Sequence, residues 1–203
     1  MNLSHDRYLT IATALRAPEL KVLGSRFIAD LAPVSSKDEV EAVLERIRTE
    51  FYDATHHCYA YRLGNMGEQE RAADNGEPSG TAGKPILMVL AGAELTNVLC
   101  VVTRYFGGTK LGTGGLARAY GEAAQLAVAE ASIQEVFLMT SLHLRSSYDE
   151  LPALERLIAQ KKLERGAATY GDTIEMEVQV RRSMAEALKE EIQEKFFGRI
   201  VIM

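Results

Sequence analysis

The fold of the first half of this chain is decided by residues 98–120, which read VLCVVTRYFGGTKLGTGGLARAY. The run Val98–Val102 is apolar and rich in β-branched side chains, a pattern typical of a buried strand. An Ala-rich helical pattern follows, from about Leu116 to Ala131. Residues 106–115, between the two, include five glycines. Glycines cluster where a backbone needs unusual dihedral angles or close approach to another group. The stretch therefore predicts a strand, a glycine-rich loop and a helix in succession.

The glycine-rich loop has the context of an anion site. Where a strand leads through glycines into a helix, backbone N–H groups and the helix N-terminus can hold a phosphate. Lys110 and Arg104 would neutralise its charge, and Thr109 and Thr113 would donate hydrogen bonds. The loop lacks the Gly-Lys-Ser/Thr ending of a Walker A motif and the spacing of a dinucleotide-binding motif. The same glycines would also serve a tight turn and close packing of the helix on the sheet, so both interpretations stay open.

A second polar segment comes earlier, at residues 74–85, with the sequence DNGEPSGTAGKP. We expect a long irregular loop from Gly64 to about Gly83, followed by a short helix that starts at the second proline of the segment. A stiff loop with both signs of charge and two hydroxyls can present a hydrogen-bonding surface. The alternative is a self-satisfied loop, in which Asp74 and Glu77 cap neighbouring N–H groups and pair with Lys84 or Arg104.

The flanking sequence adds further elements of an α+β domain. Ser36-x-x-Glu39 is a capping box. The apolar residues within 40–47 recur at the spacing of an amphipathic helix. Further strands are expected at residues 8–13, 20–23, 26–31 and 58–62.

The last third of the chain has a different pattern. In Thr173–Val180 apolar and polar residues alternate with a period of two, as in a half-buried strand. Helices are expected behind two further capping boxes, 147–150 and 183–186. The remaining strands are expected at residues 136–144, 163–170 and 200–202. The order βαββαβ predicts a ferredoxin-like domain, so we expect two domains, residues 1–136 and 137–203.

Charge is unevenly distributed along the chain. The net charge of −5 argues against indiscriminate nucleic-acid binding. Between Glu94 and Glu122, however, there is no acidic residue, while Arg104, Lys110 and Arg118 all lie there. No stretch approaches the roughly 20 apolar residues of a membrane helix, and the first 25 residues lack the core of a signal peptide. We expect a cytoplasmic protein with a local basic site.

Other catalytic and metal sites find little support. His56-His57-Cys58 resembles a metal-site fragment, but a site needs three or four ligands, and neighbouring strand residues point to opposite faces. A buried pair of Cys58 and Cys100 without metal fits better, so we expect neither metal nor cofactor. Ser79 and Thr81 are not part of a nucleophile elbow with His and Asp partners.

Aromatic residues flank the basic positions. Tyr105, Phe106 and Tyr120 lie beside Arg104, Lys110 and Arg118 in the sequence. Aromatic side chains next to cations suit stacking on unpaired bases. Core packing explains at least Phe106 equally well.

Four stretches together resemble the YigZ/IMPACT family: Ser25–Phe27, His56–Arg62, 74–85 and 101–120. The resemblance implies an N-terminal domain with the fold named after the second domain of a small-subunit ribosomal protein. It also implies a C-terminal domain similar to the last domain of elongation factor G. Eukaryotic family members are implicated in translational control. One departure is Asn75, where the family has a second acidic residue.

These observations support two main hypotheses. The first is a regulatory or binding protein of translation that contacts RNA, the ribosome or an associated factor. The second is an enzyme or sensor for a small phosphorylated ligand or nucleotide, with Asp74 or Glu77 as general base or magnesium ligand. A protein–protein scaffold is the third, weaker hypothesis. We favour the first and expect the ligand-binding residues to face one cleft. They are Asp74, Glu77, Ser79, Thr81, Lys84, Arg104, Tyr105, Gly107, Gly108, Lys110, Gly112, Thr113, Gly114, Gly115 and Arg118.

Overall fold

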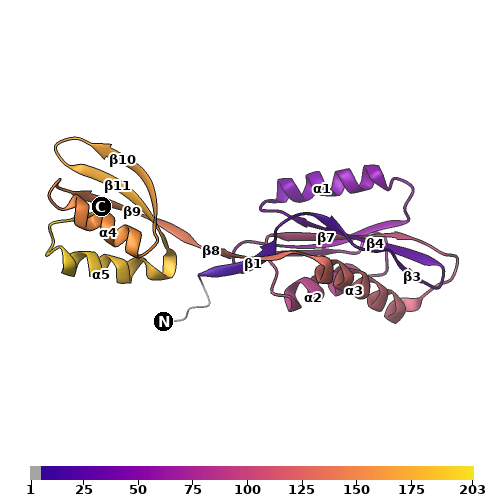
Figure 1. Ribbon diagram of the computed structural model, residues 1–203. Helices are drawn as coiled ribbons and strands as arrows, with labels where there is room; N and C mark the ends of the chain where they lie inside the picture. Colours follow the sequence, from indigo (N-terminus) through magenta and orange to yellow (C-terminus); the bar gives the residue numbers. More distant parts are fainter. Residues whose placement is uncertain (1–5) are drawn as a thin grey trace. The chain divides into compact units, whose positions relative to one another are not determined.

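The computed structural model describes residues 6–203, which form two compact units (Figure 1). One unit is Tyr8–Val136, and the other joins Phe137–Met203 with Asp6 and Arg7. The predicted α+β fold with two domains is confirmed. Asp6, which we expected in the first domain, belongs to the second unit because its carboxylate accepts hydrogen bonds from the N–H and hydroxyl of Ser183.

The first unit is built on an antiparallel sheet with the strand order β2-β4-β7-β5-β6, in which β3 also pairs with β4. Its strands are β2 (Leu15–Arg16), β3 (Leu20–Val22), β4 (Ser25–Pro33), β5 (His56–Leu63), β6 (Gln69–Ala73) and β7 (Val98–Tyr105). A separate two-stranded sheet pairs β1 (Arg7–Ile11) with β8 (Ile133–Phe137). The strand predicted from the run Val98–Val102 is confirmed as part of the central β7, which is buried along almost its whole length because helices cover both faces of the sheet.

Helices cover the sheet on both sides. Figure 1 shows α1 (Lys37–Glu50) over one face and α2 (Gly83–Gly92) and α3 (Gly112–Glu130) over the other. Two hydrophobic cores result, one on each face. The core beneath α2 and α3 includes Phe27, Cys58, Cys100, Leu116, Tyr120 and Ala124. The core beneath α1 includes Val40, Leu44, Ile47, Tyr59 and Val101.

The predicted start of α1 is confirmed. The hydroxyl of Ser36 accepts a hydrogen bond from the N–H of Glu39 at 3.2 Å. The carboxylate of Glu39 reaches back to the N–H of Ser35 rather than to that of Ser36. The first bond satisfies an N–H group that a helix start leaves without a partner, and the second fixes the residue that precedes the cap.

Two sequence expectations for the first unit were wrong. The long loop from Gly64 contains β6, a five-residue edge strand paired with β5. Its largely exposed side chains give no alternation of apolar and polar residues that would mark a strand. Helix α3 begins at Gly112 and not at Leu116, so three of the loop glycines lie in its first turn. Glycine is a poor helix former, and packing of the following turns stabilises this start.

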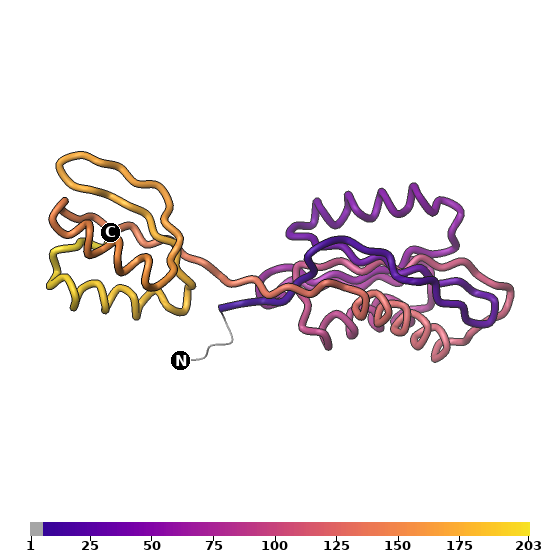
Figure 2. The backbone as a smooth tube through the Cα atoms, viewed as in Figure 1, coloured from indigo at the N-terminus to yellow at the C-terminus, as the bar shows by residue number. Residues whose placement is uncertain are grey.

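The second unit has the predicted βαββαβ order and the sheet order β10-β11-β9-β12 of a ferredoxin-like domain. Figure 2 traces the backbone of this unit in orange to yellow. Its elements are β9 (Met139–Ser146), α4 (Leu151–Gln160), β10 (Glu164–Tyr170), β11 (Ile174–Arg181), a 3₁₀ turn (Arg182–Met184), α5 (Ala185–Lys195) and β12 (Val201–Ile202). The period of two in β11 is confirmed, since its apolar side chains are buried under the helices.

Local details of the second unit differ from the expectations. The strand expected at 136–144 is divided at Leu138 into β8 and β9. The N–H of Leu138 donates a hydrogen bond to the carbonyl of Asp6, and the carbonyl of Leu138 accepts one from the N–H of Arg182. Neither expected serine cap forms. Helix α4 follows Glu150 without a side-chain cap. Ser183 binds Asp6 instead, a contact over 177 residues of sequence that no local pattern reveals.

Candidate functional site

The two polar segments meet at a buried ion pair. Glu77 Oε1 lies 2.5 Å from Arg104 Nη1, and the two side chains are only 4% and 6% exposed. The hydroxyl of Tyr120 donates a second hydrogen bond to the same carboxylate oxygen at 2.8 Å. Arg104 Nη2 donates to the hydroxyl of Ser25 at 3.2 Å, while its Nε has no hydrogen-bond partner among the described residues. We call these four residues, Ser25, Glu77, Arg104 and Tyr120, the Arg104 network.

The surroundings of the network explain why Tyr120 does not stack on a ligand. Its ring is fully buried and packs edge-on against Phe27, with ring centroids 5.1 Å apart. Burial raises the pKa of Tyr120, and the neighbouring Cys58 and Glu77 add to that effect. The expectation that Tyr120 offers a face to unpaired bases is therefore wrong. Tyr105 is partly exposed, and its hydroxyl donates a hydrogen bond to the carboxylate of Asp53. Phe106 is exposed.

Asp74 acts as an internal cap. Its Oδ1 accepts hydrogen bonds from the N–H groups of Ala82 and Gly83, both at 2.9 Å, and its Oδ2 accepts one from Gly80 at 2.7 Å. Burial alone would raise the pKa of Asp74, but these three hydrogen bonds together hold it below its ordinary value. Asp74 thus caps the start of α2, and Glu77 is held in the Arg104 network. Both carboxylates make internal hydrogen bonds, as in the self-satisfied alternative.

Asn75 has a structural role that an aspartate could not fill. Asn75 and Gly76 both have positive φ, 42° and 95°, and the N–H of Glu77 bonds to the carbonyl of Asp74 at 3.0 Å. This is the turn geometry in which Asn-Gly is preferred. The Asn75 side chain also donates to the carbonyl of His57 at 3.0 Å. An ionised aspartate has no proton to donate there.

Packing accounts for two of the glycines. A Cβ on Gly107 would lie 1.9 Å from the carbonyl carbon of Gly24, and a Cβ on Gly83 would lie 2.4 Å from the backbone nitrogen of Ala73. Gly107 also donates its N–H to the Ser25 hydroxyl at 3.1 Å. The first turn of α3 differs, because a Cβ on Gly114 would meet no atom within 4 Å.

The exposed part of the predicted site surrounds the start of α3. Residues 106–110 and 112–114 are exposed, and Gly108 and Gly112 have positive φ. Helix α3 has no side-chain cap and no acidic residue in its first turn. Arg118 folds back on that turn, where its Nε donates to the carbonyl of Gly114 at 3.3 Å. Exposed N–H groups, the positive end of the helix dipole and two cations, Lys110 and Arg118, can hold an anion here.

The predicted site residues thus divide into two sets. Asp74, Glu77, Thr81 and Arg104 make internal contacts, and the Thr81 hydroxyl donates to the carbonyl of Pro78. Of the predicted ligand residues in segment 74–85, Ser79 and Lys84 are exposed. Arg118 also lines a groove of about 1060 Å³ between α2 and α3. A single cleft that holds all fifteen residues stays a prediction.

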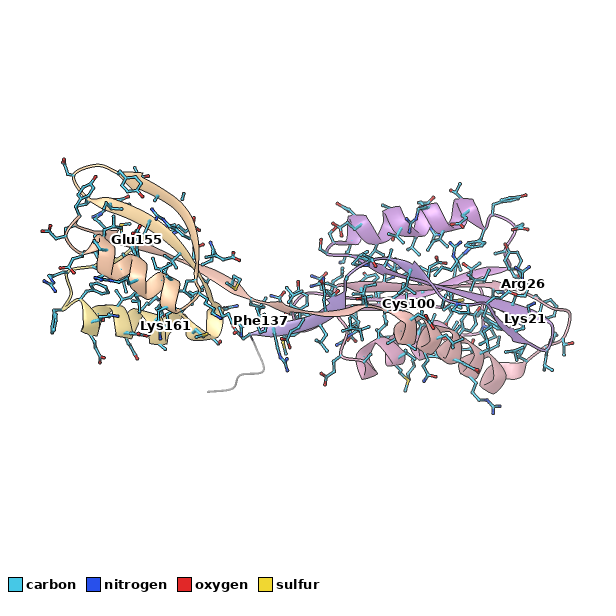
Figure 3. The ribbon with its side chains drawn as sticks, viewed as in Figure 1. Lys21, Arg26, Cys100, Phe137, Glu155 and Lys161 are labelled. Atoms are coloured by element: carbon cyan, nitrogen blue, oxygen red, sulfur yellow. The ribbon has the colours of Figure 1, made fainter. Side chains whose placement is uncertain are left out.

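The histidines and cysteines are explained by local structure. His57 is buried beside the hydroxyl of Thr103, and burial, followed by the charge of Arg48, lowers its pKa. Burial raises the pKa of Cys58 and of Cys100 to about 12 each. Both thiols are free and lie inside the first unit, where Figure 3 labels Cys100. Among residues 6–203, no group of three His, Cys, Asp or Glu side chains is placed to hold a metal.

Sequence reasoning did not find the partners that hold the two segments together. Ser25 and Tyr120 complete the Arg104 network from β4 and α3, which lie far from Glu77 in the sequence. The available signals were the stretches Ser25–Phe27 and 101–120, which both contribute to the family resemblance. No helix in the described part of the chain is long and apolar enough to cross a bilayer.

Comparisons with known proteins agree with this architecture. The family model described as Impact N-terminal domain matches residues 23–128, and one described as a domain of unknown function, DUF1949, matches residues 144–199. The IMPACT family member YvyE of Bacillus subtilis is 36% identical over 89% of this chain and 83% of its own length. YigZ of Escherichia coli is 39% identical over 67% of this chain and 68% of its own length.

A solved structure also matches almost the whole chain. It is a crystal structure described as that of a hypothetical protein, 29% identical, with a TM-score of 0.67 and coverage of 98% of this chain and 97% of that chain. Each family model matches one of the two structural units, and the match to YvyE is long enough to include both. The chain therefore belongs to the IMPACT family, as the resemblance of its two polar segments had indicated.

Proposed function

We propose that this protein is a non-catalytic regulatory protein of translation, which binds RNA, the ribosome or a translation factor at the start of α3. We define the α3 N-terminal surface as residues 106–110, 112–114 and Arg118. The observation that carries the proposal is a contrast between two helix starts. Asp74 caps α2 with a carboxylate, whereas α3 has no side-chain cap and no acidic residue in its first turn. An anion is favoured at such a helix start, and RNA supplies one at every phosphate.

The charges around α3 add to this preference. Lys110 precedes the helix, and Arg118 lies over its first turn. The chain has no acidic residue from 95 to 121, so its net charge of −5 comes from other regions. The ring of Phe106, four residues before Lys110 in the sequence, is exposed and is suited to stacking on an unpaired base.

The surface is held in a fixed shape by the contacts beneath it. Gly107 is anchored by its hydrogen bond to Ser25 and by its close packing on Gly24. Arg104, which precedes this segment on β7, is fixed by Glu77 and Ser25. A preformed loop loses little conformational freedom when it binds, so more of the contact energy is available as affinity. On this account, the Arg104 network supports the surface and does not contact the ligand.

The proposed role in translation rests on membership of the IMPACT family. The chain belongs to the IMPACT family, and the resemblance of its motifs implies a role in translational control. A cytoplasmic location and a phosphate-bearing macromolecular partner are parts of the same proposal.

The test is co-sedimentation with purified ribosomes at low and moderate salt. We expect wild-type protein to sediment with ribosomes at low salt and to be released as salt rises, since each phosphate contact releases counterions. The variant Lys110→Ala/Arg118→Ala should lose this binding. The matched control is Lys37→Ala/Arg71→Ala, which removes two exposed cations elsewhere in the same unit and should bind as wild type.

Two other outcomes would contradict the proposal. Equal loss in both double variants would mean that binding depends on overall charge and not on the α3 N-terminal surface. No sedimentation by any folded protein would argue against ribosome binding. In that case, a rise in Tm with inorganic phosphate that Lys110→Ala/Arg118→Ala abolishes would favour a small phosphorylated ligand.

A further inference from the structure

One edge of the second unit's sheet is only partly covered. Strand β9 pairs with β11 over its whole length, from Met139 to Ser146. On its other side β12 pairs with Leu144 and Arg145 alone, and the N–H of Met203 adds one bond to the carbonyl of His143. The stretch Met139–Leu142 therefore has a strand neighbour on one side only among the described residues.

The direction of the backbone groups follows from the alternation of an antiparallel ladder. The carbonyl of Leu138 bonds to Arg182 next to β11, so even-numbered residues of β9 direct their backbone groups at β11. The carbonyl of His143 bonds to Met203, so odd-numbered residues direct theirs at β12. The N–H and C=O groups of Met139 and Ser141 thus face the open edge. Within residues 6–203 they have no hydrogen-bond partner.

The opposite edge of the same sheet is protected, which makes the open stretch unusual. Strand β10 carries charged residues, Glu164 and Arg165, and a register irregularity between Arg165 and Ala168. Charges and bulges are the devices that keep sheet edges from pairing with other chains. The stretch Met139–Leu142 reads Met-Thr-Ser-Leu and has no charge, proline or bulge.

A cavity of about 600 Å³ lies beside this open edge. The sheet contributes Thr140, Leu142 and Ile202 to its wall, and the 3₁₀ turn and α5 contribute Arg182, Glu186 and Lys189. Glu186 and Lys189 pair with each other at 2.7 Å. No carboxylate of the described chain lies within ion-pair distance of Arg182, so the cavity has one surplus positive charge.

We propose that the open edge of β9 binds an extended peptide segment that carries a carboxylate side chain. The segment would add a strand beside Met139–Leu142, with hydrogen bonds to Met139 and Ser141, in the mode known as β-augmentation. Cross-strand neighbours share a face of the sheet. The peptide side chains opposite Thr140 and Leu142 would therefore enter the cavity, where Arg182 receives the carboxylate.

Amide hydrogen exchange on the full chain tests the backbone part of the proposal. The probe is the capped peptide acetyl-Thr-Val-Thr-Glu-Thr-Val-amide. Without it, the amides of Met139 and Ser141 should exchange rapidly, while those of Thr140 and Leu142 are protected by β11. With saturating peptide, exchange at Met139 and Ser141 should slow by about tenfold or more, because their N–H groups become hydrogen bonded.

The charge preference is tested with two matched variants. Arg182→Glu should weaken binding of this peptide by about tenfold or more, since it places like charges together. Lys195→Glu makes the same charge change on an exposed residue of α5 outside the cavity and should bind as wild type. A probe with Lys in place of Glu should bind wild type weakly and Arg182→Glu more tightly.

Three results would overturn the proposal. The first is unchanged exchange at Met139 and Ser141 with the peptide in excess. The second is protection of these two amides, without peptide, equal to that of Thr140 and Leu142. The third is protection that follows protein concentration instead of peptide concentration, which would assign the edge to a second copy of the chain.

Discussion

Glu77 and Arg104 form an ion pair inside the first unit, with 2.5 Å between Oε1 and Nη1 and almost no exposure of either side chain. The pair joins the segment before α2 to the strand that leads to α3. Tyr120 and Ser25 complete its hydrogen bonds. Glu77 and Arg104 therefore hold the two loops in place and leave the outer surface to other residues.

Removal of either Glu77 or Arg104 alone should lower the free energy of unfolding strongly. Glu77→Ala leaves Arg104 buried without its counter-charge, and we expect a loss of about 3–5 kcal/mol in the free energy of unfolding. The double variant Glu77→Leu/Arg104→Met should lose less than Glu77→Ala, because it leaves no buried charge. Urea unfolding measures both values. A loss below about 1 kcal/mol for Glu77→Ala would mean that the pair is not buried in solution.

Asp74 should make the stability depend on pH at the acid end. Its pKa is lowered in the folded protein, so its stabilisation is fully present above its unfolded pKa of about 3.9 and is lost as pH falls through the folded value. The destabilisation caused by Asp74→Asn should therefore be largest at neutral pH, on the order of 1 kcal/mol, and shrink below about pH 4.

The control for this measurement is Asp172→Asn, which changes an exposed aspartate in the turn between β10 and β11. Thermal unfolding between pH 3 and pH 7 gives both curves. A constant difference between wild type and Asp74→Asn over this range would show that the cap does not depend on the charge of Asp74.

Asn75 can be tested by restoring the acid that the family resemblance implies. Asn75→Asp loses the hydrogen bond to the His57 carbonyl and should cost about 0.5–1.5 kcal/mol at pH 7. Asn75→Gly keeps the positive φ but lacks the donor, so it isolates the hydrogen bond from the backbone conformation. If Asn75→Asp were as stable as wild type while Asn75→Gly were not, the hydrogen bond would not explain the residue.

The glycines of the β7–α3 connection should respond very differently to alanine. Gly107→Ala places a Cβ against the backbone of Gly24 and should cost about 2–3 kcal/mol. Gly114→Ala meets open space within a helix and should stabilise by about 0.5–1 kcal/mol. Chemical denaturation ranks the two variants. Equal effects would contradict the close packing of Gly107 on Gly24.

Much of the fold could be predicted because its signals are local. The helix start at Ser36 and the period of two in β11 each depend on residues close in sequence, and both predictions are confirmed. Strand β6 was not predicted, because an edge strand with exposed residues shows no periodic pattern of apolar residues. The start of α3 was predicted at the wrong residue, because its first turn is rich in glycine. Helix propensity does not reveal the packing that stabilises this turn.

The site was less predictable because its contacts are long-range. The sequence offered Glu77 and Arg104 both as a ligand set and as an internal pair, and only the fold distinguishes these alternatives. Tyr120 was proposed for stacking because it follows basic residues, yet its helix turns it into the core. The exposed predicted ligand residues are Ser79, Lys84 and those around Lys110 and Arg118.

Binding of ribosomal RNA as a function of salt concentration tests the central claim most directly. The slope of log affinity against log salt counts the phosphate contacts, at roughly one unit for each cation that contacts a phosphate. We predict that Lys110→Ala/Arg118→Ala reduces this slope by about 1–2 and weakens binding, while Lys37→Ala/Arg71→Ala leaves both unchanged. Identical slopes for wild type and Lys110→Ala/Arg118→Ala, with the fold intact, would contradict RNA binding at the start of α3.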